Sequence, residues 1–293
     1  MDGLAEYLSY HRQSSIAKDI DPQNDCLQYV ANRFELNMEQ RYWLAFLFGT
    51  CYCAPTVYYI YNEFPDYNTV NIDRLEKWWK ANKDRLVFQT DRQRVRSNDQ
   101  FVQSFISYRQ IVGKNQENHF SAFKKQDPKA TYANAFESMS DVFSFGRFTM
   151  FIYLEMVSVL TNCKMIPIDL DLKNAESCRN GLALALDRKD LFTHVVDKKL
   201  TKDDYQDLNT GLLKIIDEIE KLTINHKNLF SIETTLCAYK KAKLGKRYIG
   251  YYIDRNREEI EKMSKNVPQG VDWSVLWEFR KANYDKKYLK ELT

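Results

Sequence analysis

Residues 42–61 read YWLAFLFGTCYCAPTVYYIY, twenty residues without a charge. A stretch of that length is long enough to cross a bilayer, so it decides between a membrane protein and a helical globular one. Five tyrosines, two threonines, Gly49 and a central Pro55 interrupt it, whereas membrane spans are rich in leucine and valine. Proline also breaks a helix, because it lacks an N–H donor. We therefore expect two buried helices with a break between Gly49 and Pro55, and no membrane insertion.

The composition extends the helical interpretation to the whole chain. Nine glycines and six prolines are few for 293 residues, whereas all-β folds use both residues in many tight turns. We expect an all-α fold, built as a single multi-helix globular domain over residues 1–293. Residues 1–36 would form an N-terminal helical extension. A division into two lobes, 37–165 and 166–293, is the alternative.

Local signals predict where several helices begin and how they pack. Asn37 and Thr201 each precede an amphipathic run and can cap its first turn. Residues 146–160 are apolar on every side, which predicts a central buried helix that contains Glu155. Gly181 lies inside another predicted helix, where a glycine usually permits a neighbour to approach closely.

The charge and the motif inventory exclude several kinds of chemistry. The net charge is only +3, so any DNA site must be a local basic face. The six cysteines lack C-x-x-C pairs, and the four histidines are widely spaced, so we expect no metal site in the protein and reduced thiols in a cytoplasmic setting. Phosphate loops and standard catalytic motifs are absent, and so is a signal peptide. An enzyme of this composition would have to use Arg, Lys, Tyr, carboxylates or Cys.

Two arginine-bearing motifs are candidate anion sites. DRQRVR (residues 91–96) brings three arginines together, and arginine forks bind phosphates through two hydrogen bonds. SFGRF (residues 144–148) precedes the apolar helix, where backbone N–H groups and an arginine could face an anion. The alternatives are a solvated loop for the first motif and an Arg147–Glu155 pair for the second. The candidate arginines are Arg92, Arg94, Arg96 and Arg147.

A third segment, residues 237–260, interleaves basic and aromatic side chains. Cations suit phosphates and aromatic rings suit unpaired bases, so this segment is a candidate DNA-binding face. A helix hairpin with a solvated lysine-rich face is the alternative. The candidate residues are Lys240, Lys241, Lys243, Lys246, Arg247 and Tyr251.

Taken together, these segments resemble one known family. YWLAFLFGTCYCAPTVYYIYNEFPD, DRQR, SFGRFTMFIYLE, CRNGLALAL, ETTLCAYKK followed by RYIGYYIDR-x-x-EEI, and VDWSVLWEFR occur in this order from Trp43 to Arg280. The set resembles the bacteriophage amino acid:DNA transferases, also called α-glutamyl/putrescinyl thymine pyrophosphorylases. The motifs are individually weak, and their order makes the resemblance specific.

The resemblance implies a fold and a reaction. The family has been related to helical DNA glycosylases, which agrees with an all-α fold. Its members displace pyrophosphate from 5-(pyrophosphoryloxymethyl)uracil in DNA with the amine of an amino acid or a polyamine. The implied partners are this modified DNA and the amine, in the cytoplasm of the infected host cell. We expect no cofactor, with a divalent metal accompanying the pyrophosphate as the alternative.

The residue inventory fits such chemistry. The four candidate arginines would bind the departing pyrophosphate. The base would have to flip out of the duplex before it could react. Glu155 or Asp254 could accept the proton of the amine as general base. Cys237 could add to carbon 6 of the uracil ring as a thiolate nucleophile.

Two other functions remain open at this point. A helical DNA glycosylase or lyase would normally carry a G-x-G hairpin, and G-x-G occurs nowhere in the chain. A non-catalytic helical DNA-binding or interaction protein would have little reason to bury charges inside apolar helices. The burial of Arg147 and Glu155 therefore separates an enzyme from a scaffold.

Overall fold

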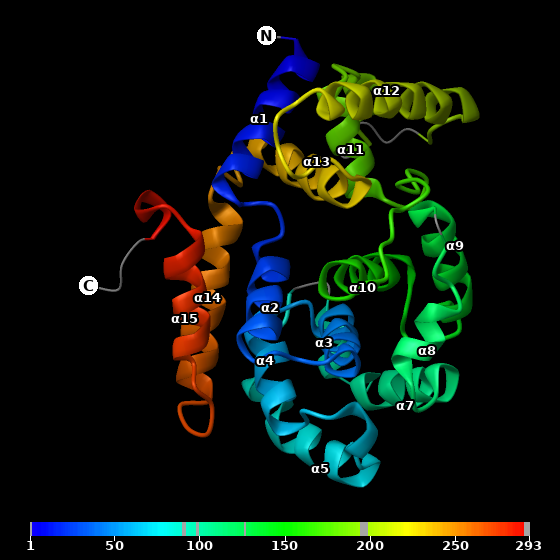
Figure 1. The fold of residues 1–293 in the computed structure, drawn as a ribbon. Coiled ribbons are helices and arrows are strands. Elements are labelled where there is room, and N and C mark those ends of the chain that lie inside the picture. Colours follow the sequence, from blue (N-terminus) through cyan, green and yellow to red (C-terminus); the bar gives the residue numbers. More distant parts are fainter. Residues whose placement is uncertain (1, 90–91, 98–99, 126, 194–198, 290–293) are drawn as a thin grey trace. The chain divides into compact units, whose positions relative to one another are not determined.

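The computed structural model describes residues 2–89, 92–97, 100–125, 127–193 and 199–289. Helices form all the regular secondary structure of these residues, which confirms the all-α prediction (Figure 1). The chain forms two compact units, each built from segments that are far apart in sequence. Unit 1 contains Met1–Pro22, Asp169–Asp254 and Tyr284–Thr293, and unit 2 contains Gln23–Ile168 and Arg255–Asn283.

Unit 2 is organised around α3 (Met38–Cys51) and α10 (Arg147–Leu160), which lie side by side (Figure 1). Most residues of both helices are buried. The surrounding helices are α2 (Pro22–Arg33), α4 (Ala54–Glu63), α5 (Ile72–Asn82), α6 (Gln93–Arg96), α7 (Gln100–Val112), α8 (Gln116–Ser121), α9 (Pro128–Met139), most of α14 (Tyr251–Asn266) and α15 (Ser274–Asn283).

Local sequence explains how α3 begins and ends. Asn37 and Gln40 form a capping box, in which each side chain accepts a hydrogen bond from the other residue's backbone N–H at 3.0 Å. The helix ends at Tyr52, which adopts a left-handed conformation with φ 49°, and Pro55 lies in the first turn of α4. The break in the apolar stretch is therefore at residues 52–53. No helix among the described residues is long and apolar enough to cross a membrane.

The break lies within the expected range of Gly49 to Pro55, and Gly49 itself, inside α3, lets α10 approach closely. A Cβ atom at Gly49 would lie 2.7 Å from the Cβ of Tyr153 in α10. The Tyr153 hydroxyl lies 3.0 Å from the hydroxyl of Tyr108, which donates to Gln116 Oε1 at 2.8 Å. The close contact between α3 and α10 thus leaves the buried Tyr153 hydroxyl within hydrogen-bond distance of the Tyr108 hydroxyl.

Unit 1 contains α1 (Gly3–Ala17), α11 (Glu176–Ala185), α12 (Lys202–Glu220) and α13 (Leu229–Lys243). Thr201 caps α12 in a capping box with Asp204, as the sequence predicts. Gly181 of α11 also has its predicted role, because a Cβ atom there would lie 2.1 Å from the carbonyl oxygen of Leu236 in α13. Any larger residue would force these two helices apart.

Candidate active-site pocket

The turn before α10 is held by serines of α7. The Phe143 N–H donates to Ser107 Oγ at 3.0 Å, and the Phe143 carbonyl accepts from Ser104 Oγ at 2.9 Å. The next residue, Ser144, has φ 64° and donates to Gln100 Oε1 at 3.4 Å. These contacts fix the point at which the chain enters α10.

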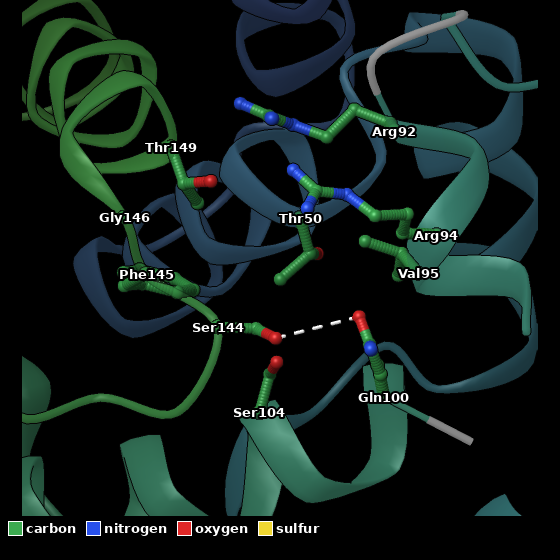
Figure 2. Close-up of a pocket in the computed structure, with 10 residues that line it drawn as sticks. All are labelled: Thr50, Arg92, Arg94, Val95, Gln100, Ser104, Ser144, Phe145, Gly146 and Thr149. Carbon is green, nitrogen blue, oxygen red and sulfur yellow. Dashed lines mark hydrogen bonds between the residues drawn. The ribbon is translucent and has the colours of Figure 1, made fainter. Parts of the chain in front are cut away.

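A pocket of about 270 Å³ lies beside this turn, within unit 2 (Figure 2). Its walls come from α3, α6, α7 and the start of α10. Four hydroxyl groups, one amide and two guanidinium groups line it, so it is suited to a polar ligand. The lining residues are Thr50, Arg92, Arg94, Val95, Gln100, Ser104, Ser144, Phe145, Gly146 and Thr149.

Arg92 and Arg94 extend into this pocket from the α6 side, toward Thr149 and Thr50 (Figure 2). Arg92 is only 6% exposed, and its guanidinium lies 4.8 Å from the centroid of the Phe148 ring. Arg94 is exposed. The aromatic contact restrains the plane of the Arg92 guanidinium.

The N-terminus of α10 adds a second source of positive potential. Gly146 is the N-cap and provides no side-chain acceptor for the first turn. The first backbone hydrogen bond of the helix runs from the Met150 N–H to the Gly146 carbonyl at 3.0 Å. An α-helix leaves its earliest amides outside this ladder, and its dipole is positive at this end. The pocket therefore combines helix amides with arginine forks, an arrangement that binds phosphate groups.

The two other candidate arginines do not line the pocket in this structure. Arg96 is half-buried, and its Nε lies 4.0 Å from Asp84 Oδ1. Arg147 is the first residue of α10, is half-buried, and holds its guanidinium 5.9 Å from the centroid of the Phe151 ring. Of the predicted group, Arg92 and Arg94 line the pocket, while Arg147 lies at the α10 N-terminus outside the lining.

A buried carboxylate behind the pocket was missed by the sequence analysis. Glu259 of α14 is 5% exposed and accepts a hydrogen bond from Gln89 Nε2 at 2.7 Å. The Gln89 carbonyl in turn accepts from the backbone N–H of Arg92 at 2.8 Å. Glu259 is therefore connected through one residue to the backbone of the pocket arginine.

The other contacts of Glu259 join more elements of unit 2. Gln23 donates to its second oxygen and accepts from the N–H of Ala54, the first residue of α4, at 2.7 Å. Arg255 Nε lies 3.0 Å from Glu259 Oε1. Burial raises the pKa of Glu259, and the Arg255 charge opposes that shift. The sequence contains two adjacent glutamates, Glu258 and Glu259. Only the packing of the structure shows that Glu259 is the buried one.

Unit 1 contains a separate cluster around Cys237, which is partly exposed. Hydrogen bonds from Cys178 and Ser177, together with the Lys240 charge, lower the pKa of the Cys237 thiol to about 6, although burial opposes the shift. The Cys237 thiol also donates a hydrogen bond to Glu233 Oε1 at 3.4 Å, which contributes to the lowered pKa of the thiol. The cluster gives Cys237 the character of a reactive thiol.

Part of the predicted DNA-binding segment is engaged within unit 1. Lys240 is 9% exposed, and its Nζ donates to Ser177 Oγ at 2.8 Å. Lys243 forms an ion pair with Glu6 at 2.9 Å. These two lysines stabilise contacts between helices of unit 1.

The remaining candidates lie at the end of α13, in the loop after it and at the start of α14. The Arg247 guanidinium lies 4.8 Å from the centroid of Tyr251 and 4.5 Å from that of Tyr252, and it donates to the Tyr252 hydroxyl. Lys241 is half-buried and Lys246 is exposed. The exposed cation and the aromatic rings keep this loop a candidate for DNA contact.

The two candidate general bases lie in different units. Glu155 is 7% exposed within α10 and is not part of the pocket lining. Asp254 is also 7% exposed, lies in the first turn of α14, and accepts a hydrogen bond from the Tyr248 hydroxyl. The burial of Glu155 in an apolar helix is the feature that separates an enzyme from a scaffold.

Comparison with known proteins identifies the family of this chain. The family model described as amino acid:DNA transferase matches residues 16–248, which include both arginine motifs. This chain belongs to the amino acid:DNA transferase family. It is also 27% identical, over 266 residues, to a serinyltransferase of Salmonella phage ViI. The matched region covers 83% of this chain and 63% of that relative, so the chain spans less than two thirds of the relative's length.

Proposed function

We propose that this amino acid:DNA transferase joins a primary amine to a modified thymine base in DNA and releases pyrophosphate. The main support is the meeting of two motifs, DRQR and SFGR, in one pocket. The pocket brings together Arg92, Arg94 and the N-terminus of α10. Helix amides and guanidinium forks are suited to a ligand with several phosphate oxygens.

The proposed reaction is a displacement at the methylene carbon of 5-(pyrophosphoryloxymethyl)uracil. The amine nitrogen forms a bond to this carbon, and the carbon–oxygen bond to pyrophosphate breaks. Pyrophosphate leaves with the electron pair, and the amine loses one proton to a carboxylate. Glu155, which lies in the same unit as the pocket, is the carboxylate that we assign to this step.

Charge stabilisation would make the largest contribution to the rate. Negative charge grows on the leaving oxygen as the carbon–oxygen bond breaks. Donors that are already oriented toward that oxygen stabilise the transition state more than the ground state. Arg92 is such a donor, since burial and the Phe148 ring restrain its guanidinium. Arg94 would contact the more exposed oxygens of the same group.

The family and its relative support the choice of DNA and an amino acid as the two substrates. A base inside duplex DNA cannot reach a pocket of this kind, so it would be flipped out of the helix. The basic and aromatic loop around Lys246 and Tyr251 would contact the strand electrostatically. The relative is named a serinyltransferase, so serine is the first amine to test.

The test is to incubate the protein with DNA that contains 5-(pyrophosphoryloxymethyl)uracil and a panel of amino acids and polyamines. Mass spectrometry of the nucleosides should show one new amine-linked base, with one pyrophosphate released per base. DNA with plain 5-hydroxymethyluracil is the control and should remain unchanged. Parallel reactions with Mg²⁺ and with EDTA determine whether a divalent metal accompanies the pyrophosphate. Failure of every amine to react would contradict the proposal.

A further inference from the structure

Phe143 is an exposed aromatic residue in a turn whose other apolar residues, Val142 and Phe145, are buried. Its exposed fraction is 48%, whereas Val142 and Phe145 are 3% and 6% exposed. It directly precedes Ser144, which lines the pocket. The ring therefore faces solvent next to a cationic site, where a polar side chain would be the ordinary choice.

The backbone holds Phe143 in this position. Both of its backbone polar groups are bonded to α7, through Ser107 at 3.0 Å and Ser104 at 2.9 Å. Ser104 is itself 1% exposed and lines the pocket. Ser144 follows with φ 64°, a left-handed conformation that is strained for a residue with a side chain. A turn held on both sides presents the ring at a defined place and lowers the entropy that binding would lose.

The surroundings indicate what such a ring would contact. The exposed Arg94 and the N-terminus of α10 favour an anionic polymer over an apolar protein surface. When a base leaves a duplex, the adjacent base pair loses its stacking partner. Aromatic side chains can replace that partner, because every base has a flat face.

We propose that Phe143 stacks on the base pair next to the extruded base and occupies part of the space that the base vacates. This inference rests on the proposed function in one respect, since it takes the pocket as the site that receives the modified base. It assigns to the turn before α10 a second role besides starting that helix.

The experiment compares Phe143→Ala with the wild-type protein on the same modified sequence in duplex and in single-stranded form. Transfer to the duplex should fall on the order of tenfold, because one stacking contact is lost. Transfer to the single strand should hardly change, since that DNA needs no unstacking. Phe143→Trp should restore activity on the duplex. Phe34→Ala is the matched control, because Phe34 is 46% exposed and also belongs to unit 2.

A binding readout separates this inference from the proposed function. When 2-aminopurine is placed beside the target base in duplex DNA, its fluorescence rises as extrusion of the target base removes its stacking partner. This signal needs no turnover. The fluorescence change should be smaller with Phe143→Ala than with Phe34→Ala. Equal losses on duplex and single strand, or an unchanged fluorescence response, would overturn the role of Phe143. Absence of transfer by the wild-type protein on both DNAs, with a normal fluorescence difference, would instead contradict the transferase proposal alone.

Discussion

The two basic segments of this protein are both rich in cations and have different surroundings. Residues 91–96 in unit 2 and residues 240–247 in unit 1 each combine several cations within a short stretch. In the first, Arg92 and Arg94 line a pocket at the N-terminus of a buried helix. In the second, Lys240 and Lys243 make contacts within their own unit. A cluster of cations therefore indicates a binding site only when the fold leaves them facing a ligand.

The difference also concerns rigidity. Arg92 is connected through Gln89 to the buried carboxylate of Glu259. Lys246 lies on an exposed loop and can adjust to a passing strand. A fixed arginine suits a single leaving group in a transition state, whereas a flexible surface lysine suits a polymer backbone. The following predictions test this contrast.

The largest effect is expected for Arg92→Lys. Transfer should slow by a hundredfold or more, which corresponds to about 3 kcal/mol, because a point charge cannot replace an arginine fork. Arg94→Lys should show a similar loss. Their melting temperatures should differ, since Arg92 is buried and Arg94 is exposed. The alternative of a solvated loop for Arg92 is incompatible with its burial.

Pyrophosphate release and melting temperature, measured side by side, check this prediction. Arg96→Lys is the matched control, because Arg96 belongs to the same motif and lies near Asp84 rather than in the pocket. It should leave the rate nearly normal and change the stability by less than about 0.5 kcal/mol. Normal turnover in both Arg92→Lys and Arg94→Lys would remove the pocket from the mechanism.

The next effect is expected for Glu259→Gln. The substitution removes a buried charge that Arg255 and two glutamines contact, and should lower the free energy of unfolding by about 1–3 kcal/mol. Transfer should slow by roughly tenfold, because the Arg92 backbone becomes less well fixed. Glu258→Gln is the control, since this neighbouring side chain is 66% exposed. A lower melting temperature with an unchanged rate would show that Glu259 stabilises the fold without positioning Arg92.

A smaller effect concerns the Cys237 thiol. Its pKa of about 6 predicts that the rate of alkylation by iodoacetamide rises through pH 6 and levels off above it. An ordinary thiol would still be gaining reactivity well above neutral pH. Cys178→Ala should move the midpoint upward, because it removes the hydrogen bond that contributes most to the shift. A midpoint near 9 in the wild-type protein would contradict the assignment of a thiolate.

The smallest effect distinguishes exposed from engaged lysines. Lys246→Ser should reduce the slope of log binding constant against log salt by roughly one, as expected for the loss of one phosphate contact. Lys240→Ser should mainly lower the melting temperature, since Lys240 bonds to Ser177 inside unit 1. Replacement of all five basic candidates by serine should flatten the salt dependence further; these are Lys240, Lys241, Lys243, Lys246 and Arg247. Equal changes of slope for the two single variants would contradict the contrast between them.

Several features of the fold could be predicted from short stretches of sequence. The caps at Asn37 and Thr201 were expected from residue type and spacing, and the structure confirms both. The close approach at Gly181 was expected because a glycine inside an amphipathic helix usually has a packing reason. The break between the first two apolar helices also lies within the expected range of Gly49 to Pro55. Gly49 itself has the same packing role against Tyr153, which the sequence analysis did not predict.

The pocket was only partly predictable. The sequence indicated that DRQR and SFGR could each hold an anion. The family resemblance implied that their arginines bind the same pyrophosphate. It could not indicate that Arg92 and Arg94 face the α10 N-terminus while Arg96 lies near Asp84. Glu259 and Phe143 were not predicted at all, because neither burial nor exposure of a single side chain can be read from its neighbours in sequence.

By itself, the sequence determined the helical class, the helix starts and the family of this protein. The helical class and the helix starts depend on interactions between residues within about four positions of each other. The family is indicated by motifs that occur in a set order along the chain. Only the tertiary structure decided which cations meet a ligand and which carboxylate is buried. These outcomes depend on packing between residues that are far apart in sequence, such as Gln89 and Glu259 or Ser104 and Phe143. Their partners exist only after the helices have assembled.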